Sequence, residues 1–400
     1  MSDGTRRWVT LLAIVALAVG LRVAMAAVHP MEQPDSHDYN ILGKQLSVAG
    51  AYVVDGKYCV RMPGYPAFLG LLLAVTGRSM DAALILQAAV SGLMVLSVYW
   101  LERRICTGVG LLAALLVAID PLSVAFSAAV LSETTFTMLM LLGLVIVLRL
   151  VEGGRFWWWL LLGLVWAAAV YVRASALYMV MPLTVVAAWW GLAGKFRRIA
   201  GPVAACGIVL LALAPWQLAH IAQFRAGFFA LTSLEGISLY EAVYPDADGS
   251  PKQNLLQPTR AMQNMNEMER NDEWSREAWR FIRQDPGRIA WLGVRKIART
   301  WNPLFNTSEL QSWPIQAVSA AWHIPLFLLA VAGIFGRSIS GRIKTVLLIP
   351  VVYFTLVHAL YLGSVRYRVP LMPLVCIFAA AGLIMLLQKL QSKRGASATV

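Results

Sequence analysis

Residues 131–150, LSETTFTMLMLLGLVIVLRL, form an apolar stretch as long as a membrane-spanning helix. A helix needs about 20 predominantly apolar residues to cross the hydrocarbon core of a bilayer. Other stretches of the chain are similarly apolar. The predicted spans lie near residues 8–28, 81–101, 108–128, 131–150, 157–176, 177–192, 200–221, 317–335, 343–361 and 370–388. The sequence therefore predicts an all-α polytopic membrane protein with about ten transmembrane helices.

The composition agrees with this fold class. Of the 400 residues, 59% are hydrophobic and 14% are charged, whereas about 25% of the residues in a soluble domain are charged. The net charge of +13 comes from basic residues that cluster in short loops between the apolar stretches. A nucleic-acid-binding domain would instead carry such residues on one soluble surface. We therefore expect membrane lipids, and no nucleic acid, as partners.

The basic clusters also predict the orientation. With ten spans they all fall on one side, which the positive-inside rule assigns to the cytoplasm. Both termini are then cytoplasmic, and the two long loops, 29–80 and 222–316, are external. The predicted parts are an N-terminal membrane part (1–221), the external loop 222–316 and a C-terminal membrane part with a short tail (317–400). The clusters are Arg6 and Arg7; Arg103 and Arg104; Arg149 and Arg155; Lys195, Arg197 and Arg198; Arg337, Arg342 and Lys344; and Lys389, Lys393 and Arg394.

Each external loop contains predicted helices. In the first loop, the apolar segment 63–77 (PGYPAFLGLLLAVTG) is too short to span the bilayer and predicts a juxtamembrane helix. In the second, residues 262–279 predict a solvated helix rich in opposite-sign pairs. Residues 288–301 predict an amphipathic helix that lies at the membrane surface. The loop 222–316 is therefore expected to be mostly helical.

Candidate catalytic side chains gather in the first external loop. Asp35 and Asp38 are carboxylates that can act as a general base or hold a divalent cation, with His37 as a third candidate ligand. Arg61 can clamp a phosphate. In the alternative interpretation, Asp35 only caps the helix that begins nearby. Tyr39 and Tyr65 flank these groups as candidate substrate contacts.

Further ionisable residues lie near the predicted external ends of the spans. Placing the carboxylate of Glu133 in so apolar a neighbourhood costs free energy, which makes the residue a candidate for a functional role. In the alternative interpretation, Glu133 lies in the first turn of a helix, where a negative charge is stabilising. Arg366 and Arg368 are candidate phosphate ligands, with simple snorkelling to the interface as the alternative. Arg173 is a weaker candidate of the same kind. Tyr367 is a possible substrate contact, with an aromatic residue of the membrane interface as the alternative.

Taken in chain order, four of these features resemble a known family. They are Asp35 with Tyr39, the Arg-x-Pro-Gly-Tyr-Pro of residues 61–66, Leu131-Ser132-Glu133, and Arg366-Tyr367-Arg368-Val369-Pro370. Together they resemble the GT-C glycosyltransferases of the dolichyl-phosphate-mannose-protein mannosyltransferase type, which include the bacterial aminoarabinose transferases. The resemblance covers residues 1–220 and 317–390. The 222–316 loop contains no motif of the family.

The resemblance implies a GT-C-like fold, a polyprenyl-phosphate sugar as donor, and transfer outside the cytoplasm, usually with inversion at the anomeric carbon. It implies a bacterial inner membrane location with the active site facing outside. Asp35 matches the acid at the family's catalytic centre, and Arg61 with Arg366 or Arg368 matches the basic residues associated with the lipid phosphate. Some members have an acid directly before the basic residue of this motif, where this chain has Val60. The resemblance therefore does not decide whether a metal site exists.

The mechanism expected from these residues is a transfer to an acceptor hydroxyl. Asp35 takes the proton of that hydroxyl, while Arg61 and Arg366 or Arg368 stabilise the departing lipid phosphate. Glu133 orients the acceptor or a metal. No cofactor is certain, and a divalent cation is the candidate. The acceptor is a protein, lipid A, another glycan or a lipid. The alternative is a secondary transporter or a flippase of lipid-linked sugars, because intramembrane ionisable groups also suit transport.

Overall fold

The computed structural model describes residues 2–48, 50–102, 109–191, 195–224, 231–252 and 257–397. In these ranges the regular elements are all helices, as the sequence predicts. Their bounds are α1 (Asp3–Val28), α2 (Pro34–Ser47), α3 (Gly64–Val75), α4 (Met80–Gly92), α5 (Met94–Glu102), α6 (Val109–Ile119), α7 (Pro121–Ser127), α8 (Ser132–Val151), α9 (Trp157–Val172), η1 (Ala174–Ala176), α10 (Leu177–Gly191), α11 (Lys195–Phe224), α12 (Glu235–Val243), η3 (Arg260–Met262), α13 (Glu267–Gln284), α14 (Pro286–Thr300), η4 (Ser308–Leu310), α15 (Trp313–Phe335), α16 (Gly341–Leu360), η5 (Val365–Leu371) and α17 (Met372–Ser397).

Among the described residues, eight helices are long and apolar enough to cross a membrane, or nine if one bent pair is a single span. Two of the ten predicted spans account for the difference. The third is the bent pair, α6 and α7, which meet at an angle of 53°. The bend falls at Asp120, which caps α7 with its carboxylate, and at Pro121, which cannot continue the hydrogen bonding of α6. The fifth is α9, which has only 16 residues.

Helix α9 nevertheless runs back along α8. An ion pair joins Arg173, at the C-terminal end of α9, to Glu133 in the first turn of α8. The chain thus leaves the level of Glu133 through the 20 residues of α8 and returns to it through α9. A short apolar helix can follow a full span in this way because the bilayer and the flanking residues adapt to a modest difference in length.

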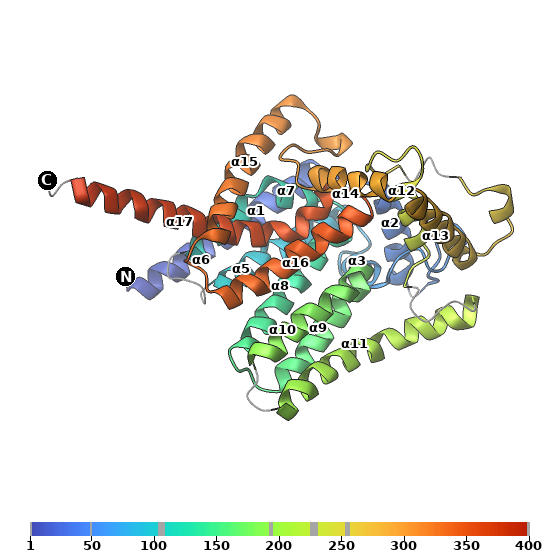
Figure 1. Cartoon of the computed structure of the whole chain (residues 1–400), viewed down its shortest axis with the longest axis horizontal. Helices are drawn as coiled ribbons and strands as arrows, with labels where there is room; N and C mark the ends of the chain where they lie inside the picture. The colour runs from blue at the N-terminus through green and yellow to red at the C-terminus, as the bar shows by residue number, and fades with distance from the viewer. Residues whose placement is uncertain are drawn as a thin grey trace.

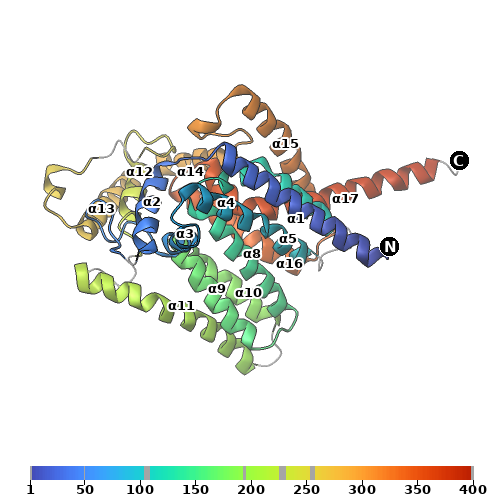
Figure 2. The ribbon, with the colours of Figure 1, turned by 180° about the vertical axis from the view of Figure 1, so that it is seen from behind.

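Both termini lie at the same end of the molecule, and α2, α12 and α13 lie at the opposite end (Figure 1). The view from behind shows the same arrangement (Figure 2). The two predicted external loops meet at that opposite end, because the Glu267 carboxylate accepts hydrogen bonds from the Tyr58 amide at 2.7 Å and from the Ser233 hydroxyl at 3.1 Å. The basic pair Arg103 and Arg104, used to predict the orientation, lies outside the described residues.

The helices of the second loop differ slightly from their predicted bounds. The predicted helix 262–279 begins later, at Glu267, because Asn266 caps it in a reciprocal arrangement with Glu269. It continues to Gln284, where Asp285 ends it and caps the next helix, α14. The expected short helix of the first loop is α3.

Close packing of α15 on α17 depends on two glycines. A Cβ at Gly333 would overlap the carbonyl oxygen of Phe378, and one at Gly382 would overlap that of Leu329. Small residues at such positions let the backbones of two membrane helices approach each other. This contact positions α17, which continues directly from the 3-10 helix η5 that carries Arg366.

We therefore expect Gly333→Ala to lower the free energy of unfolding by about 1–3 kcal/mol, the usual effect of overpacking. The measurement is the midpoint of thermal unfolding of the detergent-solubilised protein. Gly20→Ala is the matched control, because a Cβ at Gly20 in α1 meets no atom within 4 Å. Equal midpoints for the two variants would contradict this account of the contact.

Candidate active site

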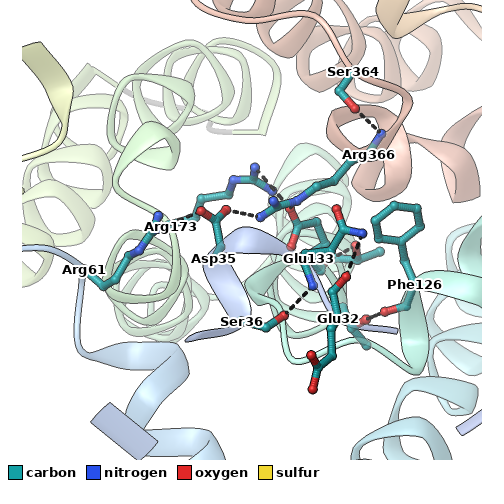
Figure 3. A network of polar contacts seen from close by, with 12 residues as sticks. Glu32, Asp35, Ser36, Arg61, Phe126, Glu133, Arg173, Ser364 and Arg366 are labelled. Carbon is teal, nitrogen blue, oxygen red and sulfur yellow. Dashed lines mark hydrogen bonds and ion pairs between the residues drawn. The ribbon is translucent and has the colours of Figure 1, made fainter. Parts of the chain in front are cut away.

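Asp35 lies in the first turn of α2, at the end of the molecule opposite the termini. The helix is capped by Gln33, and Pro34 occupies its first position. Proline is favoured there because that position needs no amide donor. The alternative interpretation of Asp35 as the cap is therefore not what the structure shows. Its carboxylate points away from the helix end and toward two guanidinium groups (Figure 3).

Those two groups come from distant parts of the chain. Arg61 Nη2 lies 2.6 Å from Asp35 Oδ1, and Arg366 Nη2 lies 2.6 Å from Asp35 Oδ2. Each carboxylate oxygen thus has its own arginine. Arg61 also contacts Asp38 Oδ2 at 2.9 Å and lies over the ring of Tyr39, with Cζ 5.3 Å from the ring centroid. The first-loop residues selected from the sequence therefore do meet, and they meet Arg366.

These charges determine the protonation state of Asp35. Its burial alone would raise the pKa, but Arg61 and Arg366 outweigh this and hold the pKa of the carboxyl well below its usual range. Burial of Arg61 acts to lower its pKa, yet Asp35 and its neighbours raise it above the usual value. Asp35 and Arg61 are thus both ionised at neutral pH.

Glu133 extends the cluster inward. It lies in the first turn of α8, as expected, and its side chain is fully buried. Arg366 Nε donates to Glu133 Oε1 at 2.5 Å, and Arg173 Nη2 lies 3.5 Å from the same oxygen. Glu133 Oε2 has no hydrogen-bond partner among the described residues. Arg366 therefore links the two acids, while Arg173 has the looser contact.

Arg368 lies apart from this cluster. Its Nη1 donates to the carbonyl oxygens of Thr300, at 3.2 Å, and Asn302, and its Cζ lies 5.2 Å from the centre of the Phe327 ring. The sequence left Arg366 and Arg368 as equal candidates. In a 3-10 helix such as η5, residues two apart project in different directions.

The candidate aromatic residues occupy different places. Tyr39 packs edge-to-face on Tyr65, whose buried hydroxyl donates to Gln87 Oε1 at 2.8 Å. Tyr367 stacks on His358 with ring centroids 4.2 Å apart. Tyr39 and Tyr367 both line the cavity described next. Tyr65 is not among the lining residues and contacts Tyr39.

A cavity of about 350 Å³ opens beside the cluster. Asp35, Arg61, Arg173 and Arg366 line one part of it, and α10, α12 and α16 supply much of the remaining wall. Lining residues outside the set selected from the sequence include Tyr178, Glu235, Tyr353, His358 and Tyr361. The sequence offered little signal for these. Glu235 is one of many acids in a nearly neutral loop, and only the fold brings α12 and α16 to the same cavity.

The three candidate metal ligands do not converge. Asp35 and Asp38 are both paired with Arg61, and His37 is exposed on α2. Across the part of the chain that the structure describes, no group of three or more His, Cys, Asp or Glu side chains is arranged to hold a metal ion. The polar atoms of the site are thus engaged by arginines.

The fold and this site together define a class: polytopic membrane proteins with a GT-C-like, all-helical fold and a buried acid–arginine cluster at one end. Residues 60–218 match the family model described as dolichyl-phosphate-mannose-protein mannosyltransferase. This match includes Arg61, Glu133 and Arg173. It agrees with the resemblance predicted from the sequence motifs over this part of the chain. No curated protein sequence matches the chain significantly.

Two solved structures of an oligosaccharyltransferase share the fold. The apo oligosaccharyltransferase of Archaeoglobus fulgidus matches with a TM-score of 0.57 at 12% identity, over 100% of this chain and 53% of that one. Its complex with Zn and sulfate matches with a TM-score of 0.56 at 13% identity, over 95% of this chain and 49% of that one. The chain thus spans about half the length of these structures. ArnT from Cupriavidus metallidurans bound to undecaprenyl phosphate has a lower TM-score of 0.43. The identity is 14%, over 96% of this chain and 78% of that one.

Proposed function

We propose that the chain transfers a sugar from a polyprenyl-phosphate donor to an acceptor hydroxyl, with Asp35 as general base. One observation carries the proposal: Asp35 is held between Arg61 and Arg366 at the wall of a cavity large enough for a sugar unit. The family match at residues 60–218 supports the reaction class. We further propose that the site faces the periplasm and that transfer inverts the anomeric carbon.

The same arginines explain how the donor prepares the base. In the free protein, Asp35 is a weak base because both guanidiniums favour its ionised form. A donor phosphate in the cavity competes for these guanidiniums. Once they bind the phosphate, their hold on Asp35 weakens and its pKa rises, which improves it as a proton acceptor. Donor binding thereby activates the base.

The phosphate contacts are assigned to the cavity-lining arginines. Arg61 and Arg366 lie on either side of Asp35, and Arg173 makes the longer, 3.5 Å contact to Glu133. Arg368 is engaged by backbone carbonyls and is therefore assigned a structural role. As the acceptor oxygen bonds to the anomeric carbon, the bond from that carbon to the phosphate oxygen breaks and negative charge develops on this oxygen. Preorganised guanidiniums stabilise that charge without reorganisation. A divalent cation that accompanies the donor would add to the same stabilisation.

The test uses the purified protein in lipid nanodiscs with a polyprenyl-phosphate sugar and a panel of hydroxyl acceptors. We expect polyprenyl phosphate to be released together with a glycosylated acceptor, both detected by mass spectrometry. Movement of intact donor across the bilayer of proteoliposomes, without any release of polyprenyl phosphate, would contradict the proposal. That result would support the flippase alternative.

The pH dependence of kcat/KM follows from the lowered pKa of Asp35. A depressed carboxyl pKa means that the ionised base, and the ion pairs that it makes, are present at neutral pH and are lost only as the pH falls below the usual range of about 4. We expect a flat wild-type profile between about pH 5 and 7. In Arg61→Gln, the acid limb should move to higher pH, because one of the two charges that lower the pKa is gone. An unchanged acid limb would contradict this coupling.

A further inference from the structure

The exposed face of α14 is apolar apart from Arg295, although α14 belongs to the predicted external loop. The side chains of Trp291 and Val294 are 62% and 55% exposed, and Ala298 continues the same side of the helix. The opposite side is buried and consists of Leu292, Lys296 and Thr300. A stripe of this kind would be unfavourable in water.

Contacts with α16 show at which depth α14 lies. Gly293 faces the carbonyl oxygen of Ala359, at the end of α16. At the C-terminal cap of α14, Trp301 Nε1 donates to the hydroxyl of Thr355 at 3.1 Å. Thr355 lies five residues before Leu360, the last residue of a membrane span, so this contact is about 7.5 Å inside the end of that helix. The C-terminal half of α14 therefore descends alongside α16.

The neighbouring surface of α16 identifies what covers the apolar stripe. Leu356 and Leu360, in the same turns that α14 contacts, are 58% and 62% exposed. They belong to a candidate span, so their surroundings are lipid. Because α14 contacts α16 in these turns, its apolar side lies at the same level as this surface. Arg295, which is also exposed on α14, can extend its guanidinium to the headgroups.

Helix α14 also holds the chain on the N-terminal side of Arg366. Lys296 Nζ donates to the carbonyl oxygen of Leu360 at 2.9 Å, and Arg299 Nε donates to that of Gly363 at 3.2 Å. Asn306 donates to the Arg299 carbonyl and accepts from the Val365 amide, at 2.9 and 3.1 Å. The backbone that leads into Arg366 is thus fixed to α14 from residue 360 to residue 365.

We infer that α14 is embedded in the bilayer leaflet beside the site, with Trp291, Val294 and Ala298 against lipid chains, and that it positions Arg366 through the 360–365 segment. The partner of this surface is the lipid itself. Lys296 and Arg299 are positioning residues, because they contact the segment before Arg366 and not the cavity. The inference does not depend on sugar transfer, since its tests measure lipid contact and backbone protection.

The first test places a spin label at Val294→Cys in nanodiscs of phosphatidylcholine and phosphatidylglycerol. The control is Arg276→Cys on α13, where the native side chain is 71% exposed. Signal from native cysteines is measured on the unsubstituted protein and subtracted. We expect collisions with a water-soluble nickel complex to be several-fold rarer at 294 than at 276, and collisions with oxygen to be more frequent. Equal nickel accessibility at the two positions would overturn the embedding.

Photolabelling of the unsubstituted protein gives an independent measurement. Phospholipids with a diazirine in the acyl chain should form adducts on the peptide that contains residues 289–295, as well as on the exposed faces of the spans. Adducts on the spans alone would overturn the embedding even if the spin-labelled variants fail to fold.

The second part of the inference is tested by hydrogen exchange. In Lys296→Met, we expect the amides of residues 363–368 to exchange several-fold faster, because the bond to Leu360 is lost. Lys344→Met is the matched control, since Lys344 Nζ also donates to a backbone carbonyl, that of Gly336, but at the opposite end of α16. Unchanged exchange in Lys296→Met would overturn the positioning role while leaving the proposed transfer reaction untouched.

Discussion

Replacing Asp35 by Asn is expected to lower kcat for sugar transfer by about 10²- to 10⁴-fold, the usual contribution of a general base. The amide cannot accept the proton of the acceptor hydroxyl. The change also removes the charge that holds Arg61 and Arg366 together. These arginines are then freer to bind the donor phosphate, so we expect donor affinity to be retained or increased. The measurement is single-turnover transfer, with the binding of polyprenyl phosphate determined separately.

Asp38→Asn is the matched control for this variant. Asp38 lies one turn further along α2 and also pairs with Arg61, at 2.9 Å. It has no contact with Arg366 among the ion pairs of the described residues. We therefore expect a much smaller loss of kcat. If the two variants lose activity equally, Asp35 acts only by orienting Arg61 and the general-base role is wrong.

Replacing Arg366 by Met is expected to have the largest effect on stability. Among the ion pairs of the described residues, the one left to the fully buried carboxylate of Glu133 is then the 3.5 Å contact to Arg173. Removing one partner of a buried ion pair costs about 3–5 kcal/mol, because the remaining charge is uncompensated. Transfer should also be lost, because the phosphate loses a ligand. The measurements are the midpoint of thermal unfolding and the transfer rate.

The double variant Arg366→Met/Glu133→Gln separates these two effects. It removes both charges of the pair, so most of the lost stability should return. Activity should not return, since the phosphate ligand is still missing. Recovery of both would show that Arg366 only compensates Glu133. A single variant as stable as the wild type would contradict the buried ion pair itself.

The sequence predicted the membrane class and most helices because span length and hydropathy are local properties. It was less informative where the length of an element is set by its neighbours. Residues 157–176 and 108–128 look like ordinary spans, yet α9 stops at Val172 and the other segment bends at Pro121. Which of these cross the bilayer depends on packing against α8 and its neighbours, and a hydropathy pattern does not contain that information.

The site was predictable in part for a similar reason. Asp35, Arg61, Glu133 and Arg366 were selected because charges are unusual beside apolar stretches, and the structure places them together. Arg368 had the same sequence signal but projects from another side of η5. The contribution of α12 to the cavity wall depends on contacts between distant segments. No comparable sequence signal therefore indicated that Glu235 lines the cavity.

The central claim is that Asp35 and the lipid phosphate share Arg61 and Arg366. A cryo-electron-microscopic structure of the protein in nanodiscs with polyprenyl phosphate tests it most directly. We predict phosphate density within hydrogen-bonding distance of both guanidiniums, with at least one of the two contacts to Asp35 lengthened. Phosphate bound at a different place, with both ion pairs of Asp35 intact, would contradict the account.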